Sequence, residues 1–429
     1  MNTWTAYRGG PARTGSLAGV DPARDPSSET AWTVQLAGGT VLPDMIRVAA
    51  ERVYVGRSDG LSVLDAATGQ QRWRYTDHAP EAGLTILPDS SPAVPDGVCD
   101  GADAVVFLAH SDGIVQLRDD GDRGQVVRTT DATVDTSASS VLCHPPDSRY
   151  IYAVVGSGKT DDRRVKVLPI GDRSAGVSLR APRISNSVYS PLSAGRVNPT
   201  AGENGTRVYV PTGDEWFPKS VSIVEAHSVV GQLTEMGDLD PPIVPNEEVL
   251  FGRYRDAIST RLFEGQDLFR CDLSRGLDTP DWSSGYCVAD HAPVVTTDRL
   301  VSTCRRGETL TAVDHDGSDQ WTVDLDGGRT DQPDPIAVGD VVYVVAGDSL
   351  LAFDHRGNEL FDYTPDAPIT ALAGADPGLY VGTKSAVHAL TDVDGTRVFA
   401  PSHSTCPDCE SNLDEYDAPD FCPECGHAL

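Results

Sequence analysis

The feature of this sequence that most limits its fold is a short β-branched or aromatic run that returns eight times. The runs are Val53–Gly56, Val105–Leu108, Ile151–Val154, Val208–Val210, Val249–Gly252, Leu300–Ser302, Val341–Val344 and Leu379–Gly382. A polar turn and two further alternating strands follow each run, and a fourth strand candidate, such as Ala292–Thr296, precedes most of them. Four antiparallel strands per unit of roughly 40–55 residues predict an all-β propeller of eight blades, with seven as the alternative.

The turns of the best-defined units share an Asp, a Gly and a later aromatic residue. The three examples are Asp65–Gly69 leading to Trp73, Asp314–Gly317 leading to Trp321, and Asp354–Gly357 leading to Phe361. Asp bonds to the backbone ahead of it and Gly accepts a positive φ, so each pair closes a hairpin. We expect the aromatic residue to lie on the outer strand and pack against a neighbouring unit. The segment 31–36 belongs to no complete unit, and we expect it to pair with the last blade and close the ring.

A family resemblance rests on two stretches of the chain. Leu64–Trp73 resembles the PQQ-like repeat, and Tyr7–Gly15 resembles the N-terminal lead-in of the same propellers. The resemblance covers residues 1–400. The family includes quinoprotein dehydrogenases, the outer-membrane assembly propeller lipoprotein and cytoplasmic propellers without an assigned activity, so the resemblance implies a fold rather than a cofactor. The Trp-Asp propeller repeat is the main competitor, but its Gly-His and Trp-Asp marks do not recur.

Four cysteines near the C-terminus have the spacing of a metal site. Cys406 and Cys409 form one Cys-x-x-Cys knuckle, and Cys422 and Cys425 form a second one after a separation of twelve residues. Each knuckle presents two thiolates to one ion, which predicts a zinc ribbon over residues 406–429 after a linker at 401–405. A redox dithiol pair and rubredoxin-like iron are the alternatives. Four thiolates leave no open coordination position, so we expect one structural Zn²⁺ that supplies about 10 kcal/mol of folding free energy.

The charge of the chain limits its partners. It has 34 Lys and Arg against 64 Asp and Glu, a formal net charge of −30, and the 406–429 segment has no Lys or Arg. Such a surface resembles proteins of extreme halophiles, the haloarchaeal type, in which salt screens self-repulsion. Binding to phosphates requires clustered cations, so we expect no nucleic-acid partner. The sequence has no apolar run that could span a bilayer and no visible secretory signal, so we also expect no membrane insertion and a cytoplasmic location.

Several other residues look functional and have simpler interpretations. Five scattered cysteines, Cys304 among them, are expected to be free and buried in a reducing cytosol. The string Ala153–Thr160 lacks only the first Gly of a P-loop, but a strand pattern rather than a helix follows it, which favours a hairpin. The ten histidines show no helical pairing, and we expect them on surfaces or loops.

These observations favour binding over catalysis. No residue stands out as catalytic, and no adjacent cysteine pair or assignable catalytic Asp supports a quinoprotein site, so we expect no PQQ. The leading hypothesis is a non-enzymatic platform, a monomeric propeller that binds a protein partner not identified by the sequence. The alternative is an enzyme or small-ligand sensor that uses the central channel of the propeller.

Overall fold

The computed structural model describes the chain in segments, and every statement below refers to them. They are residues 16–17, 30–91, 94, 102–134, 142–144, 149–155, 164–170, 200–201, 208–214, 217–225, 228–236, 249–254, 267–272, 282–288, 293–296, 298–304, 307–327, 332–375 and 378–390. The regular elements in these segments are all β-strands. In this part of the chain no helix is long and apolar enough to cross a bilayer.

The strands follow one another along the chain in antiparallel groups. The first half contains β1 (Ser16–Leu17), β2 (Trp32–Gln35), β3 (Val41–Ala49), β4 (Arg52–Arg57), β5 (Gly60–Asp65), β6 (Gln71–Tyr75), β7 (Gly83–Pro88), β8 (Ala104–His110), β9 (Gly113–Asp119), β10 (Gly124–Asp131), β11 (Leu142–Cys143), β12 (Tyr150–Val155), β13 (Arg164–Pro169), β14 (Thr200–Ala201), β15 (Val208–Asp214), β16 (Phe217–Glu225) and β17 (Ser228–Met236). The second half contains β18 (Val249–Tyr254), β19 (Asp267–Asp272), β20 (Trp282–Val288), β21 (Val294–Val295), β22 (Arg299–Cys304), β23 (Thr309–Asp314), β24 (Asp319–Asp324), β25 (Ile336–Val338), β26 (Val341–Ala346), β27 (Ser349–Phe353), β28 (Glu359–Tyr363), β29 (Ile369–Ala375), β30 (Gly378–Thr383) and β31 (Ala386–Leu390).

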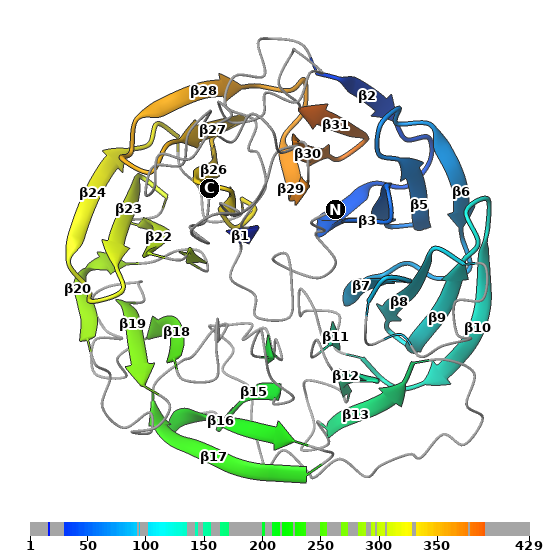
Figure 1. The fold of residues 1–429 in the computed structure, drawn as a ribbon, viewed down its shortest axis with the longest axis horizontal. Helices are drawn as coiled ribbons and strands as arrows, with labels where there is room; N and C mark the ends of the chain where they lie inside the picture. The colour runs from blue at the N-terminus through cyan, green and yellow to red at the C-terminus, as the bar shows by residue number, and fades with distance from the viewer. Residues whose placement is uncertain are drawn as a thin grey trace, which may run out of the picture.

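These strands form separate small sheets that stand around a common centre (Figure 1). The described strands make the sheets β3–β6, β7–β10, β11–β13, β14–β17, β18–β20, β21–β24, a sheet of β25–β28 with β1, and a sheet of β29–β31 with β2. Each of the recurrent runs found in the sequence is a strand, namely β4, β8, β12, β15, β18, β22, β26 and β30. The prediction of an all-β propeller with antiparallel blades is therefore confirmed.

The two ends of the strand series meet in one sheet. The segment expected to close the ring lies as β2 on the rim, and it pairs antiparallel with β31 through Trp32 to Ala389 and Val34 to Val387 (Figure 1). This pairing makes β2 the outer strand of the last sheet, so one sheet contains strands from both ends of the described series. A second N-terminal contact was not predicted: β1 adds to β25 in parallel, with Ser16 opposite Ala337.

The meander within each sheet assigns its turns to two faces of the ring. We call the face with the second-to-third-strand turns and the sheet-to-sheet connections the connection face. The opposite face, with the first-to-second and third-to-fourth turns, is the hairpin face. Antiparallel strands reverse direction at every turn, so all equivalent turns lie at the same end.

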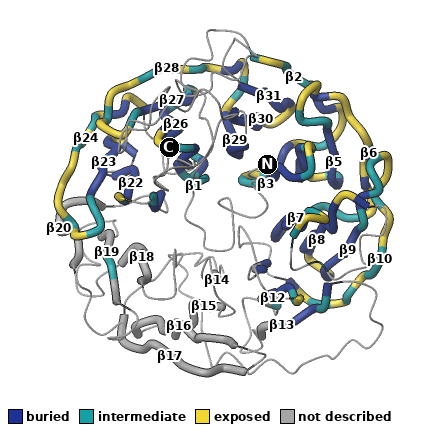
Figure 2. The backbone as a smooth tube through the Cα atoms, in the orientation of Figure 1, coloured by how far each residue is buried: buried dark blue, intermediate teal, exposed yellow. Residues whose placement is uncertain are grey.

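The apolar core lies between neighbouring sheets rather than inside any one of them. One cluster joins the β3–β6 and β7–β10 sheets through residues such as Leu61, Trp73 and Val106, and another joins the β21–β24 and β25–β28 sheets. Inner strands such as β8 are buried along their whole length, whereas outer strands such as β10 alternate or face solvent (Figure 2). Each sheet thus depends on its neighbours for burial, as expected of a radial repeat.

Two sequence expectations about local chemistry have different outcomes. β12 and β13 pair antiparallel, with Val155 opposite Arg164, which confirms the hairpin interpretation of the P-loop-like string; the loop itself lies outside the described residues. The expectation of free thiols is wrong for Cys304, which is buried but disulfide-bonded.

Candidate functional site

The most polar buried cluster joins the first two sheets and has a structural role. Asp119, which is fully buried, ends β9 and accepts hydrogen bonds from Tyr54 Oη (2.7 Å), Trp73 Nε1 (2.8 Å) and Arg52 Nη1 (3.1 Å) of the preceding sheet. Arg52 also forms an ion pair with Asp103 at 2.5 Å. Burial, followed by the charge of Asp119, raises the pKa of Tyr54 well above 10, so its hydroxyl donates at neutral pH. Every group here is engaged within the ring, which leaves none for a ligand.

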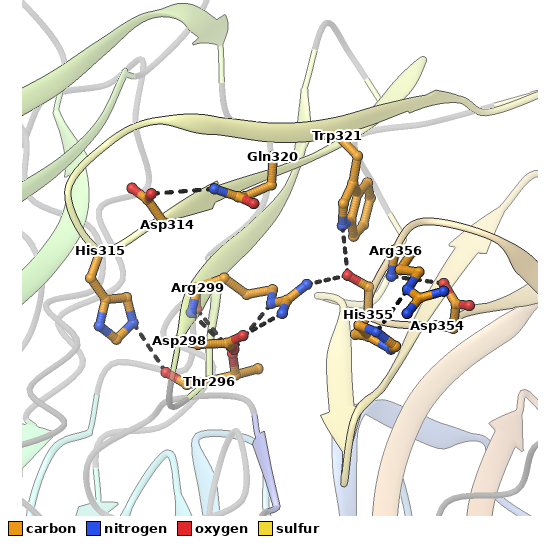
Figure 3. Close-up of polar contacts among 10 residues, drawn as sticks. All are labelled: Thr296, Asp298, Arg299, Asp314, His315, Gln320, Trp321, Asp354, His355 and Arg356. Atoms are coloured by element: carbon orange, nitrogen blue, oxygen red, sulfur yellow. Dashed lines mark hydrogen bonds and ion pairs between the residues drawn. The ribbon is translucent and has the colours of Figure 1, made fainter.

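The same arrangement recurs on the hairpin face between the β21–β24 and β25–β28 sheets (Figure 3). The carbonyl oxygen of His355 accepts hydrogen bonds from Trp321 Nε1 (3.1 Å) and from the guanidinium of Arg299. Asp298 binds the same guanidinium, and the Arg299 hydrogen bond lowers the pKa of Asp298 to about 2. Arg299 thus serves the same purpose as Arg52, and the cluster in Figure 3 joins two blades.

A third junction lies where the ring closes. The carbonyl oxygen of Ala66 accepts from Trp32 Nε1 (3.0 Å) and from Tyr380 Oη (3.1 Å). The contacts of Trp73 with Asp119 and of Trp321 with His355, described above, confirm the prediction that outer-strand aromatic residues pack against the next unit.

Each of these tryptophan rings lies flat on a glycine of the next sheet. A Cβ atom at Gly124 would lie 2.5 Å from Trp73, one at Gly69 would lie 2.6 Å from Trp32, and one at Gly357 would lie 2.8 Å from Trp321. No side chain larger than hydrogen fits at such a distance. These glycines are therefore required for close packing between blades, in addition to any role in the turns.

A hollow of about 240 Å³ on the connection face is the best candidate for a binding site in the described part of the chain. It lies between the β3–β6 and β7–β10 sheets, and three turns line it: Ser58 and Asp59 between β4 and β5, residues 76–79 and Glu81 between β6 and β7, and residues 110–112 between β8 and β9. The lining is mostly polar, with several carboxylates and two histidines.

The two histidines lie against each other. The rings of His78 and His110 are 4.1 Å apart at an interplanar angle of 11°. His110 is only 5% exposed, and its Nδ1 accepts the backbone N–H of Asp112 at 3.3 Å, while its buried Nε2 has no hydrogen-bond partner among the described residues. Burial and the neighbouring His78 lower the pKa of His110, although Asp112 and Glu81 oppose the shift. The ring is thus neutral at pH 7, with its proton on Nε2.

The expectation of surface or loop histidines is wrong for two of them. His110 and His388 lie in β8 and β31 and are only 5% and 7% exposed, whereas His144 is 6% exposed but follows β11 in a loop. His110 ends a strand, so its ring is carried into the gap between two sheets. Sequence periodicity finds the strand but gives no signal for a contact with His78, which lies on a separate connection.

The carboxylates of the hollow differ in how their charge is compensated. Burial alone would raise the pKa of Asp59, but the Gly39 N–H and the guanidinium groups of Arg57 and Arg74 outweigh it and lower that pKa. Asp77, Glu81 and Asp112 form no ion pair in the described structure; Glu81 accepts only the Ser111 N–H at 3.3 Å. The hollow therefore has excess negative charge beside the neutral imidazole of His110.

Metal ligands converge nowhere in the described residues: no group of three or more His, Cys, Asp or Glu side chains could hold an ion there. The predicted zinc ligands Cys406, Cys409, Cys422 and Cys425 lie outside the described residues, as does the whole segment 391–429. The zinc site thus stays a prediction.

Comparison with models of known protein families shows the family to which the chain belongs. A family model described as "Outer membrane protein assembly factor BamB" matches residues 23–198 and 261–401, which is more than half of the sequence. The chain belongs to this BamB family. The matched segments include the sheets whose tryptophan junctions are described above. No curated protein sequence matches the chain.

Solved structures agree with this assignment at the level of the fold. BamB from Moraxella catarrhalis is similar over 85% of this chain and 99% of that protein, with a TM-score of 0.56 and 14% identity. Europium-containing methanol dehydrogenase matches 90% of each chain, with a TM-score of 0.60 and 11% identity. The dihydro-heme d1 dehydrogenase NirN in complex with DHE matches 87% of this chain and 81% of its own, with a TM-score of 0.52 and 12% identity. Identities this low show a shared fold alone.

Proposed function

We propose that the chain is a non-enzymatic platform for a protein partner, built on an eight-bladed propeller with a C-terminal zinc ribbon. The observation that carries this proposal is the BamB family match, because the description of that family names a protein assembly factor. The tryptophan junctions at Asp119, His355 and Ala66 support it, since they fasten neighbouring described sheets to each other and so preorganise a binding surface.

The test of the platform is a stoichiometric complex. The full chain, purified from its own cells in a buffer of matching ionic strength, should elute with a defined partner, and light scattering should give a constant mass ratio for the complex. Cross-linking followed by mass spectrometry should place that partner on turns of the ring. A chain that always elutes alone, with no cross-links to another protein, would contradict the proposal.

We further propose that Cys406, Cys409, Cys422 and Cys425 hold one structural Zn²⁺ in the ribbon. The support is the spacing of the two knuckles. Atomic emission should find one equivalent of zinc, and a chain ending at residue 405 should contain none. Iron in place of zinc would favour the rubredoxin-like alternative, and metal-free thiols would favour a redox pair.

A second candidate, an enzyme or small-ligand sensor, is favoured by the likeness to two dehydrogenase structures. It predicts a small molecule or cofactor that stays with the purified chain. Mass spectrometry of the denatured protein distinguishes this candidate from the platform, which predicts no retained organic cofactor.

A further inference from the structure

The hollow between the first two sheets combines three features that together specify a ligand. The first is charge. Asp77 and Glu81 come from the connection between β6 and β7, and Asp112 comes from the turn between β8 and β9, so carboxylates without a described ion pair approach from two sides. Like charges held close together raise each other's energy, and a cation placed between them relieves it.

The second feature is a buried donor without an acceptor. The His110 side chain is only 5% exposed. Because its Nδ1 accepts the Asp112 N–H, the proton of the neutral ring is on Nε2. That Nε2 atom has no partner in the structure. An unpaired buried donor costs about 1–3 kcal/mol, so a ligand that brings a carbonyl oxygen gains from pairing with it.

The third feature is the flat pair of rings. The His78 ring lies against His110 at 4.1 Å and 11°, and it is only half-buried. A planar cation can stack against the half-buried His78 ring, while the Nε2–H of His110 donates in the plane of its own ring.

A metal ion does not fit these features. Binding to Nε2 requires an unprotonated nitrogen, but the Asp112 N–H directs the proton to that atom. The described residues also provide no converging set of ligands. An ammonium ion would satisfy the charge but offers neither a planar face nor a fork of donors for carboxylates on two sides.

We infer that this hollow binds an arginine side chain presented by a protein partner. The guanidinium pairs with Asp77, Glu81 and Asp112, and a main-chain carbonyl next to the arginine accepts from His110 Nε2. The hollow's volume of about 240 Å³ has room for a guanidinium and part of its stem. This inference rests on the proposed function, since it names the chemistry by which the platform recognises its partner.

The test uses N-acetyl-L-argininamide, which contains the guanidinium and two carbonyl groups, added to the full chain. Imidazole ¹⁵N resonances report binding, because a guanidinium against His78 and a carbonyl oxygen on His110 Nε2 change the environment of both rings. We expect a saturable shift confined to His78 and His110. N-acetyl-L-citrullinamide, which has nearly the same shape without the charge, should bind at least tenfold more weakly, and N-acetyl-L-lysinamide severalfold more weakly.

Two double variants separate local charge from the overall charge of the protein. Asp77→Asn with Glu81→Gln should weaken argininamide binding at least tenfold. Asp89→Asn with Asp122→Asn removes the same charge from exposed positions on the hairpin face, and should leave binding within twofold of the original. Thermal melts check that both variants remain folded. Equal binding of the citrulline compound, equal loss in both variants, or the absence of a saturable shift would overturn the inference.

The outcome is independent of the test of the platform itself. A stoichiometric partner whose binding persists in the Asp77→Asn/Glu81→Gln variant would refute the arginine site and leave the platform intact. Saturable argininamide binding by a chain that never forms a protein complex would refute the platform and favour a small-ligand site.

Discussion

Removal of the Asp119 carboxylate tests the interpretation of the tryptophan junctions. In an Asp119→Ala variant, Tyr54 Oη and Trp73 Nε1 lose their acceptor in a buried site, while Arg52 keeps its pairing with Asp103. Each orphaned donor costs about 1–3 kcal/mol, and loss of one partner of a buried charge cluster costs about 3–5 kcal/mol in all. The two costs describe the same lost contacts and so are not summed. We therefore expect the free energy of opening at this junction to fall by about 4 kcal/mol. Asp119→Asn keeps one acceptor oxygen and should lose about half as much.

The assay is native-state hydrogen exchange of the β5 and β6 amides, which measures the free energy of opening at this junction. A global unfolding curve is less suitable, because a ring of this size need not unfold in two states. Asp122→Ala is the matched control: it lies on the β9–β10 hairpin but is exposed, and should change the opening free energy by less than about 0.5 kcal/mol. An Asp119→Ala effect below about 1 kcal/mol, or one no larger than the control, would refute the reasoning.

Three further predictions follow from the same contacts. Gly124→Ala should cost about 1–3 kcal/mol by the same exchange assay, because its Cβ would lie 2.5 Å from Trp73; no measurable cost would mean that the ring does not lie on this glycine. Asp298→Asn should flatten the acid limb of the stability profile: the Arg299 hydrogen bond lowers the pKa of Asp298 from 3.8 to about 2, so its contribution is present above pH 4 and is lost as the pH falls to about 2. Thermal melts from pH 2 to pH 5 measure this, and parallel curves for variant and parent would contradict it. Cys422→Ser should abolish the one equivalent of zinc and leave the melting temperature of the ring unchanged; full zinc retention would contradict the four-thiolate site.

The repeated strands could be predicted from the sequence because they are encoded locally. Runs such as Val53–Gly56 alternate with a period of two, and the Asp and Gly residues of the hairpins have their own turn chemistry. The position of Trp73 on an outer strand also follows from the turn before it. These signals identify the blade without reference to its neighbours.

Contacts between blades could not be predicted in the same way. Asp119 lies 46 residues from Trp73 and 65 residues from Tyr54, and nothing in its own segment distinguishes it from the other aspartates of this acidic chain. The parallel addition of β1 involves only Ser16 and Leu17, too short a stretch to show a period. The hollow is similar: His78 and His110 belong to different turns and meet only when two sheets pack.

Closure of the ring by β2 can be measured by hydrogen exchange of its amides. We expect the amides of Trp32–Gln35 to be protected as strongly as those of their partners in β31, because the two strands pair from Trp32–Ala389 to Gln35–Ala386. Exchange of β2 at the rate of an unstructured peptide, with β31 still protected, would mean that the ring is open and that the account is wrong.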